Sequence, residues 1–567
     1  MVKIGPAFGD FISLEKSQKH KGGYNSTYSV RSYLLLLILA LAVILLVSRL
    51  FFLQVIKGGT YRNLSDSNRT KTIPIHASRG VIFDRTGVPL VYNVPGFRMT
   101  VGNQIKLVSQ DDALKLISEG KTNLEVDSLR NYPLKDATAH VLGYIGQISE
   151  NELRETRFSA YSGGDLIGKT GIEQEYESSL KGTDGKVLDE INSLGQVVRK
   201  LGQTDPIPGQ NISLTLDAAL QAEVFAAAKG IGKGAVIVSN PQGEILALVS
   251  KPSFDPNLFT MSEEYLPDAG SPYKSVSQII LDSDNQPLLD RAIGGVYPPG
   301  STFKLIVAAA GLEDKVIDEN FQIEDTGILK LGNFSFGNWY FLQYGKTDGE
   351  VNVVKAIQRS NDIFFYKLAE MVGVDRLSQF AEKFGLGRKL GIDLSGEEPG
   401  TVPTEEWKKT VIGENWYLGD TYHYGIGQGF ILTTPLQVNS WTQAIANNGV
   451  MYKPHLLLSQ APSKTDKFLS DNTVSLIRQG MVGVCNTGGV AWPLFNFTVK
   501  GKSVSIACKT GTAQHGTEET LPHAWITLFA PSDKPQIIVT VLSEDSGEGS
   551  NVAAPIAKQI LEYWFSR

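Results

Sequence analysis

The chain has 567 residues, 42% of them hydrophobic and 20% charged, which is typical of globular domains with ordinary cores. Its formal net charge of −6, with no basic stripe interleaved with aromatic residues, gives no reason to expect a nucleic-acid partner. The two cysteines are too few for a disulfide framework, and neither they nor the seven scattered histidines show metal-ligand spacing. We therefore expect no metal and no cofactor.

An apolar segment near the N-terminus breaks the globular pattern. Residues 33–48 carry no charge, and residues 50–56 continue the run beyond Arg49. About 20 helical residues cross the roughly 30 Å hydrocarbon core of a bilayer, so we predict a transmembrane anchor at 32–56 after a short tail at 1–31. A cleavable signal peptide is the alternative, but about 30 mostly polar residues precede the run and no A-x-A-like site follows it. Basic residues flank both ends, so charge does not settle the orientation.

The stretch after the anchor is rich in turn signals, such as Asp84-Arg85-Thr86-Gly87, between short β-branched runs. We predict one irregular, β-rich module at 57–215. Beyond this module the composition changes, and an alanine-rich helix is predicted at 217–229, with Asp217 as its N-cap. A hairpin around Asn240-Pro241-Gln242-Gly243 follows, with strands at 234–239 and 245–249.

The remaining chain is predicted to be mainly helical until strands return near its end. Helices are expected at 301–313, 353–371, 374–384, 435–447, 473–480 and 553–564, and strands at 504–509, 523–529 and 536–542. Strand pairs at both ends with helices between them predict one sheet built from distant segments and flanked by helices. Residues 216–567 are therefore predicted to form an α/β (α+β) sandwich.

A candidate nucleophile lies at Ser301. The pattern Ser-x-x-Lys occurs several times, but only Ser301-Thr302-Phe303-Lys304 follows a turn, Pro298-Pro299-Gly300, and opens an apolar helical run. Ser301 is expected at the helix N-terminus, where unpaired N–H groups favour a developing negative charge. Lys304 would lie on the same face and take the serine proton if burial lowers its pKa. The alternative is an ordinary N-cap beside a surface lysine.

A second lysine belongs to Lys509-Thr510-Gly511, at the end of a predicted strand that runs on to Thr512. Gly511 would let a substrate backbone approach closely, and the N–H of Thr512 could join that of Ser301 as an oxyanion hole. Another copy of this tripeptide, at 169–171, starts a predicted helix in the first module, which makes it the weaker candidate.

The third element is a serine between these two. Literal Ser-Asp-Asn occurs at 283–285, before Ser301 and so in the wrong order, and at 470–472, where it is typical of a helix cap. We choose Ser360-Asn361-Asp362, midway between the other two elements. Such a set, S-x-x-K with S-D-N and K-T-G, is that of β-lactamases and penicillin-binding proteins. It predicts a serine acyltransferase that acts on a peptide or β-lactam carbonyl.

These residues resemble those of class B penicillin-binding proteins, the membrane-anchored D,D-transpeptidases of bacterial cell walls. Further blocks similar to the family's motifs lie at 79–87, 168–173, 211–217 and 253–257. The resemblance implies a cytoplasmic N-terminus, a single pass through the bacterial inner membrane, an external pedestal at 57–215 and a penicillin-binding transpeptidase domain at 216–567.

Within that family the chain looks like the elongation type. Ser-x-Asp at 360–362 is common there, and so are the blocks at 130–133, 139–144, 425–429 and 434–437. Two residues depart from the family pattern, Asp290 where Asn is usual and Cys508 where Gly or Ala is usual, and neither is a catalytic group. Some elongation-type relatives carry a Cys/His zinc site between the first two motifs. Residues 323–355 contain neither residue type, so we predict no zinc.

The resemblance also implies roles for the site residues. Ser301 attacks the stem peptide with Lys304 as base, and Ser360 and Lys509 pass the proton to the leaving D-Ala. Asp362 orients the network or contacts the peptide, and the substrate-binding residues are Asp362, Thr510, Gly511 and Thr512. β-Lactams would acylate the same serine, and hydrolysis of the acyl-enzyme would give a D,D-carboxypeptidase side activity. The alternatives are a β-lactamase, whose class A deacylating loop has no counterpart between Asp362 and Lys509, and a non-catalytic β-lactam sensor or scaffold.

The implied partners are peptidoglycan stem peptides, the membrane, and a SEDS-family glycan polymerase with the elongation machinery. Small residues in the anchor, Ala40, Ala42 and Ser48, would allow close helix packing in lipid, or are simply tolerated in an apolar run. Cys485 and Cys508 should lie outside the cytoplasm, where disulfides persist. Two buried free thiols are expected rather than a bridge, because nothing in the sequence fixes their separation.

Overall fold

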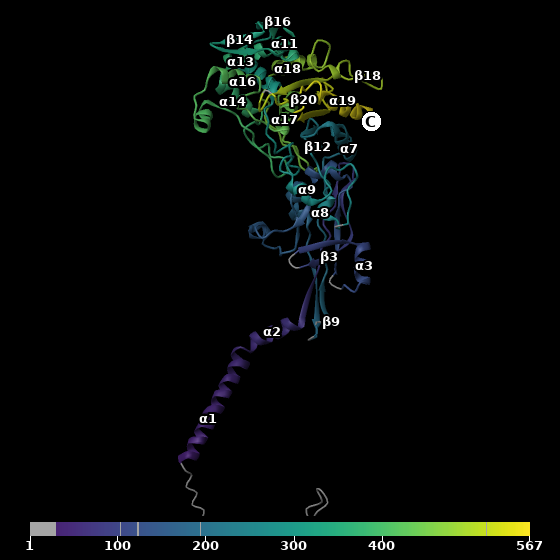
Figure 1. Ribbon diagram of the computed structural model, residues 1–567, viewed down its shortest axis with the longest axis vertical. Helices are drawn as coiled ribbons and strands as arrows, with labels where there is room; N and C mark the ends of the chain where they lie inside the picture. The colour runs from purple at the N-terminus through teal and green to yellow at the C-terminus, as the bar shows by residue number, and fades with distance from the viewer. Residues whose placement is uncertain are drawn as a thin grey trace, which may run out of the picture. The chain divides into compact units, whose positions relative to one another are not determined.

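The computed structural model of the protein describes residues 30–101, 104–121, 124–192, 194, 196–262, 264–517 and 519–567 (Figure 1). Of the predicted tail at 1–31, residues 1–29 lie outside this range. Contacts divide the chain into two units, 1–73 with 187–203 and 74–186 with 204–567. The predicted boundary after residue 215 falls inside the second unit, and a division of the chain at that point stays a prediction.

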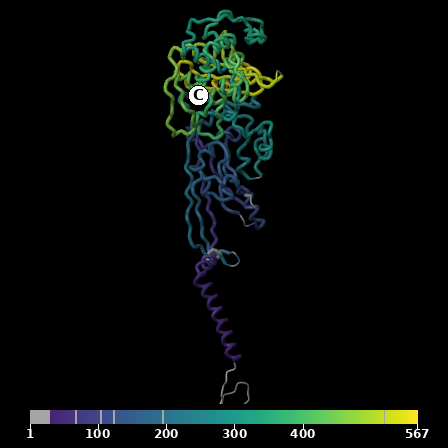
Figure 2. The backbone as a smooth tube through the Cα atoms, turned by 90° about the vertical axis from the view of Figure 1, so that its left-hand side faces the viewer, coloured from purple at the N-terminus to yellow at the C-terminus, as the bar shows by residue number. Residues whose placement is uncertain are grey.

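The first unit is built on the apolar helix. α1 (Val30–Phe51) continues into a π-helical turn, η1 (Phe52–Ile56), and Figure 2 shows this segment as one uninterrupted rod. The apolar residues of this helix are not buried inside the protein. The helix is long and apolar enough to cross a membrane. It therefore fits a single-pass anchor at the predicted position. α2 (Gly58–Arg69) follows, and then a three-stranded sheet in the order β1 (Thr70–Ile75), β8 (Gly185–Ile191), β9 (Val197–Thr204).

The N-terminal part of the second unit is rich in strands, as predicted for the first module. Its five-stranded sheet has the order β10-β2-β3-β4, with β5 paired to β3. The bounds are β2 (Ile82–Phe83), β3 (Pro89–Val101), β4 (Gln104–Ser109), β5 (Leu124–Asn131) and β10 (Ile212–Ser213). Around it lie β6 (Ile145–Gln147), β7 (Leu166–Gly168), α3 (Gln110–Ser118), α4 (Ala139–Leu142), α5 (Gly171–Glu175) and α6 (Glu177–Leu180).

A buried ion cluster joins two of the sequence blocks in this part. Arg79 Nε lies 2.5 Å from Glu173 Oε2, and Arg79 Nη2 lies 2.6 Å from Glu177 Oε2. Arg130 Nε lies 2.7 Å from the other oxygen of Glu173. Since buried charges persist only when they are paired, this cluster explains why an Arg-Gly turn and a Gly-x-x-Gly-x-Glu helix start occur in the same module.

The C-terminal part of the second unit is organised around a five-stranded sheet in the order β12-β11-β21-β20-β19, and its neighbouring strands are antiparallel. The strands are β11 (Gly234–Ser239), β12 (Ile245–Lys251), β19 (Ala507–Ala513), β20 (His523–Ala530) and β21 (Ile537–Ser543). α7 (Ala218–Ala227) and α19 (Ala553–Ser566) pack against each other and against the sheet, and α17 (Pro435–Ala446) packs against strands β11, β20 and β21. The sheet is thus assembled from distant segments, and the predicted hairpin and its preceding helix, capped by Asp217, are confirmed.

Further helices and small sheets complete this part. The helices are α8 (Asn257–Thr260), α9 (Val276–Leu281), α10 (Lys304–Glu313), α11 (Trp339–Tyr344), α12 (Val353–Arg359), α13 (Asp362–Val372), α14 (Val374–Lys383), α15 (Glu405–Trp407), α16 (Leu418–Gly425) and α18 (Asp471–Val484). The small sheets pair β13 (Gln322–Asp325) with β16 (Gly349–Asn352), β14 (Ile328–Leu331) with β15 (Phe334–Gly337), and β17 (Thr498–Val499) with β18 (Lys502–Ser503).

Several predicted elements have different bounds, and three of these differences involve the motif residues. The helix predicted at 353–371 is broken at Ser360, whose φ of 53° is left-handed and ends α12 before α13 begins. The helix predicted at 301–313 starts at Lys304, because Ser301 lies in a preceding 3-10 turn, η6 (Gly300–Thr302). The strand predicted at 504–509 runs instead from Ala507 through the Lys-Thr-Gly tripeptide to Ala513, where it keeps pairing with β20.

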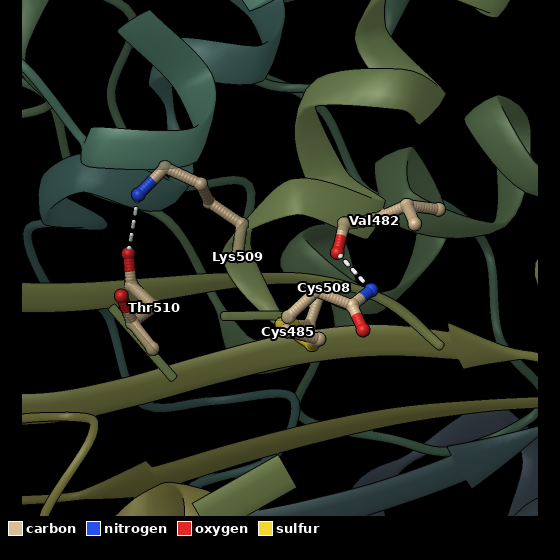
Figure 3. The surroundings of a disulfide bond; sticks show 6 residues. Val482, Cys485, Cys508, Lys509 and Thr510 are labelled. Carbon is tan, nitrogen blue, oxygen red and sulfur yellow. Dashed lines mark hydrogen bonds between the residues drawn. A yellow bond between two sulfur atoms is a disulfide. The ribbon is translucent and has the colours of Figure 1, made fainter. Parts of the chain in front are cut away.

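The expectation of two free thiols is wrong. Cys485 and Cys508 form a disulfide, with their Cα atoms 6.0 Å apart (Figure 3). Cys485 is the C-cap of α18, and α18 packs against β19, which carries Cys508. This packing brings the two Cα atoms into the 4.4–6.8 Å range that a disulfide requires. The sequence could not supply that separation, because it depends on how a helix and a strand pack together.

Candidate active site

Ser301 is presented by a tight turn before a buried helix. Gly300 has a φ of +53°, which favours glycine, and its N–H donates to the carbonyl of Gly427 at 2.9 Å. Thr302 Oγ1 donates to the carbonyl of Pro299 at 2.8 Å, which closes the turn. The apolar helix α10 then buries all but the last of its residues, and its first residue, Lys304, is fully buried with them.

The Nζ atom of Lys304 is the centre of a short-range network. It donates to Asp362 Oδ1 at 2.6 Å and to the carbonyl oxygen of Ser360 at 2.8 Å, and it lies 3.4 Å from Ser360 Oγ. The structure therefore brings Lys304 together with two residues of the chosen Ser360-Asn361-Asp362 element. A surface lysine, the alternative considered from the sequence, is excluded by its burial.

Ser360 sits between two helices in a conformation that is rare for a residue other than glycine. It is the left-handed C-cap of α12, and Asn361 is the N-cap of α13, with its Oδ1 accepting from the N–H of Phe364 at 2.9 Å. Such a left-handed residue costs free energy and persists only where the surroundings fix it. Here the break between the helices turns the Ser360 side chain toward both lysines.

Lys509 approaches from the sheet. It lies on β19, the edge strand, and its Nζ donates to Ser360 Oγ at 2.9 Å and to the carbonyl of Thr510 at 2.9 Å, the second bond being drawn in Figure 3. β19 also packs against η6, the turn that carries Ser301. The helix α10, the α12–α13 junction and the edge strand therefore converge, and the three predicted catalytic elements lie together.

Both lysines have perturbed acidities. Burial lowers the pKa of Lys304 from its ordinary value, while the neighbouring carboxylate of Asp362 acts in the opposite direction. Burial also holds the pKa of Lys509 well below its ordinary value, and the positive charge of Lys304 lowers it further. Removing water from an ammonium group disfavours its charged form, so a larger fraction of each lysine is the neutral amine here than in water, and only the neutral amine can accept a proton.

The residues after Lys509 line the edge of the sheet. A side chain at Gly511 would place its Cβ 3.0 Å from Trp525 Cβ and 3.1 Å from the carbonyl oxygen of Pro299, so the close packing of β19 on the Ser301 turn favours glycine. Thr510 is buried, whereas Thr512 is exposed. An edge strand offers backbone groups to an extended peptide, which makes β19 a ready platform for a substrate.

The rejected motif copies lie elsewhere. Ser470 is the N-cap of α18, with its Oγ accepting from the N–H of Thr473 at 3.2 Å, as the sequence suggested. Lys169 Nζ pairs with Glu152 at 2.6 Å in the strand-rich part. The sequence analysis missed Asn338 and Trp339, which contact the backbone and side chain of Asp362. Their segment, with no Cys or His, carries no motif that could have revealed them.

One group of possible metal ligands occurs within the described residues, at His515, His523 and Asp545. The two imidazole rings are stacked, with centroids 3.8 Å apart and an angle of 12° between their planes. Nitrogen lone pairs lie in the ring plane, so those of stacked rings run side by side and do not converge on one ion. His515 Nε2 lies 2.6 Å from Asp545 Oδ1, as in an ordinary His–Asp pair.

Comparisons with known families match two parts of the chain. Residues 233–562 match the Penicillin binding protein transpeptidase domain, and residues 120–214 match the Penicillin-binding Protein dimerisation domain. Among curated proteins, the peptidoglycan D,D-transpeptidase MrdA of Acinetobacter baumannii is 33% identical over 95% of this chain and 88% of its own length. MrdA of Haemophilus influenzae is 34% identical over 92% of this chain and 89% of its own.

Solved structures agree with these matches. PBP2 of Pseudomonas aeruginosa, in complex with WCK 5153, is 36% identical with a TM-score of 0.69 and covers 87% of this chain and 96% of its own. PBP2 of Helicobacter pylori, in complex with MreC, is 29% identical with a TM-score of 0.74 and covers 88% of this chain and 99% of its own. The predicted fold, an α/β transpeptidase domain after a strand-rich module and one apolar helix, is confirmed. The chain belongs to the penicillin-binding proteins with a transpeptidase domain.

Proposed function

We propose that this protein is a serine D,D-transpeptidase that cross-links peptidoglycan stem peptides through an acyl-enzyme on Ser301. The observation that carries the proposal is the convergence of Lys304 and Lys509 on Ser360 Oγ, at 3.4 and 2.9 Å, beside the turn that presents Ser301. The relatives named peptidoglycan D,D-transpeptidase support the same reaction.

Acylation begins when Ser301 Oγ attacks the carbonyl carbon of the penultimate D-Ala. The neutral amine of Lys304 takes the hydroxyl proton, an oxygen–carbon bond forms, and the bond to the terminal D-Ala nitrogen breaks. Lys509 and Ser360 then deliver a proton to the leaving amine, because their hydrogen bond gives that proton a path. The backbone N–H groups of Ser301 and Thr512 stabilise the negative oxygen of the intermediate.

The second half-reaction reverses these roles. The amine of a neighbouring stem peptide attacks the ester carbon, gives its proton to the network and displaces Ser301 Oγ, which recovers a proton from Lys304. Water in place of that amine would give D,D-carboxypeptidase activity. A β-lactam follows the first half alone, since its opened ring stays attached to the serine.

Substrate binding uses the edge strand. The hydroxyls of Thr510 and Thr512 and the ammonium of Lys509 bind the terminal carboxylate of the stem peptide. Lys509 has a lowered pKa without ligand, but an incoming carboxylate favours its charged form and raises that pKa. Lys509 can therefore take up a proton as the substrate binds and release it to the leaving group.

The protein would act at the bacterial inner membrane, in cell elongation. The helix Val30–Ile56 would cross that membrane once, with the N-terminus in the cytoplasm and the catalytic domain outside it. The disulfide between Cys485 and Cys508 supports the outside location, because disulfides persist in oxidising compartments. A SEDS-family glycan polymerase is the proposed partner. A similar solved structure, which concerns the coordination of polymerization and crosslinking by a peptidoglycan synthase complex, supports this proposal.

The proposal is tested by incubating the full-length protein with polymerised glycan that carries pentapeptide stems. Release of D-Ala and formation of cross-linked dimers are then measured. If the protein is a transpeptidase, we expect both products, and we also expect a long-lived penicillin adduct. Rapid turnover of penicillin without cross-links would support a β-lactamase instead. Absence of both activities in the folded protein would support a scaffold.

A further inference from the structure

The carboxylate of Asp362 is held on two sides. Its Oδ1 accepts from Lys304 Nζ at 2.6 Å, and its Oδ2 accepts from the backbone N–H of Trp339 at 2.8 Å. The backbone N–H of Asp362 in turn donates to the side-chain oxygen of Asn338 at 3.1 Å. Two consecutive residues from another segment therefore fix both the position and the rotation of the acid that pairs with Lys304.

Asn338 is itself fixed by a buried carboxylate. It is fully buried, and its Nδ2 donates to Asp325 Oδ2 at 2.8 Å. The same oxygen of Asp325 accepts from Asn361 Nδ2 at 2.9 Å and from the N–H of Asp348 at 2.9 Å. Its other oxygen accepts from the N–H of Gly327 at 2.9 Å. The carboxylate of Asp325 thus accepts four hydrogen bonds from N–H groups.

The fold explains why these groups meet. Asp325 ends β13, which pairs with β16, and the hairpin of β14 and β15 leads directly back to Asn338. Asn361 and Asp362 start α13 on the other side. Through its hydrogen bonds to Asn338 and Asn361, Asp325 therefore links the segment that lies between Lys304 and Ser360 to the Ser360-Asn361-Asp362 element.

We propose that Asp325 and Asn338 are positioning residues of the acylation step, which hold Asp362 so that its Oδ1 stays paired with Lys304. This inference rests on the proposed function, because acylation of Ser301 is its readout. Neither residue touches the substrate. Each acts through Asp362, whose distance from Lys304 helps to set the acidity of that lysine.

Asp325→Asn is the sharpest variant, because it keeps the shape and changes the hydrogen bonding. Asparagine has one acceptor oxygen, so its NH2 group must face at least one of the four donors that Asp325 accepts. That group would repel either the N–H of Gly327 or the three donors on the other oxygen. In either orientation the loss of the negative charge weakens the remaining hydrogen bonds, so Asn338 and Asn361 are held less firmly. A misplacement of about 1 Å near a reacting group costs about 100-fold in rate, so we expect penicillin acylation of the full-length protein to slow by about 10- to 100-fold.

Two further readouts separate positioning from a general loss of stability. Withdrawal of Asp362 would lower the pKa of Lys304, so the pH profile of acylation in Asp325→Asn should move to lower pH. In an Asp362→Asn background the added effect of Asp325→Asn should fall below about threefold, because residues that act through one another are not additive. Asn338→Ala removes the residue that connects Asp325 to Asp362. It should show the same shift of the pH profile and the same non-additivity with Asp362→Asn, and it replaces Asp325→Asn as the test if that variant does not fold.

Asp318→Asn is the matched control. Asp318 also accepts two backbone N–H groups, at 2.9 Å each, but in an exposed turn outside the network, so acylation should be unchanged. Acylation of folded Asp325→Asn within twofold of the native rate would overturn the inference, and so would an equal loss in the Asp362→Asn background. If the native protein is never acylated, the proposed function fails. A crystal structure of Asp325→Asn then decides the inference, and an intact Asp362–Lys304 pair would overturn it.

Discussion

Lys509 Nζ donates a 2.9 Å hydrogen bond to Ser360 Oγ across 149 residues of sequence. One group lies on an edge strand and the other on a left-handed residue between two helices. Because Lys304 Nζ also lies 3.4 Å from Ser360 Oγ, the two lysines are linked through this hydroxyl, which is the route that the proposed mechanism assigns to the proton. This contact supports the proposal that Ser360, and not Ser470, is the middle catalytic serine.

Ser360→Ala should therefore slow penicillin acylation strongly, by about 10²- to 10⁴-fold, the usual contribution of a positioned proton-transfer group. Ser470→Ala should leave acylation nearly unchanged, since Ser470 only caps α18, and should cost about 1 kcal/mol of stability. Stopped-flow measurements with a fluorescent penicillin and thermal unfolding check both. A folded Ser470→Ala variant that no longer reacts would contradict the choice of Ser360.

The rate of acylation should rise with pH, because Lys304 must be neutral to accept the serine proton. Burial lowers its pKa, and Asp362 works against that effect. Asp362→Asn removes the opposing charge, so the midpoint of the profile should move to lower pH even though the plateau rate falls. The observed rate of acylation between pH 5 and about pH 9.5 measures this. A midpoint that moves upward would show that Lys304 is not the base.

Much of the site could be predicted from sequence, because its groups lie in short motifs that keep their local spacing. Ser301 and Lys304 were placed by a Pro-Pro-Gly turn before an apolar run, and Asp217 and Ser470 by N-cap chemistry. Local backbone preferences decide such features.

The parts that could not be predicted depend on packing between distant segments. The disulfide requires α18 to meet β19, and the break at Ser360 requires surroundings that sustain a left-handed serine. Asp325 and Asn338 lie 13 residues apart around a small hairpin with no recognisable pattern. Their role follows only from the folded hydrogen bonds.

The disulfide should be quantitative in protein isolated without reductant. Mass spectrometry after alkylation and proteolysis should find the 485–508 cross-link and no alkylated cysteine. Bridging residues 23 apart restricts the unfolded chain, so the Cys485→Ser, Cys508→Ser double variant should lose about 3 kcal/mol of stability. Complete alkylation of both thiols in the unreduced, denatured protein would contradict the bridge.

The anchor helix should contribute to the proposed polymerase partnership. Its small residues Ala40, Ala42 and Ser48 allow close packing with another helix in lipid. Replacing the segment Val30–Ile56 by an unrelated transmembrane helix should leave penicillin acylation unchanged, because the catalytic residues all lie elsewhere, and should reduce glycan polymerisation by the co-expressed SEDS protein. Unchanged polymerisation and cell elongation would mean that the helix is only a tether.

The most direct test of the account is to locate the acylated residue. The full-length protein is treated with penicillin, digested, and its peptides are analysed by mass spectrometry, with Ser301→Ala in parallel. We predict one stable adduct, on Ser301 of the native protein, and none in the Ser301→Ala variant. An adduct on any other residue, or an equal adduct in Ser301→Ala, would contradict the assignment of Ser301 as the nucleophile.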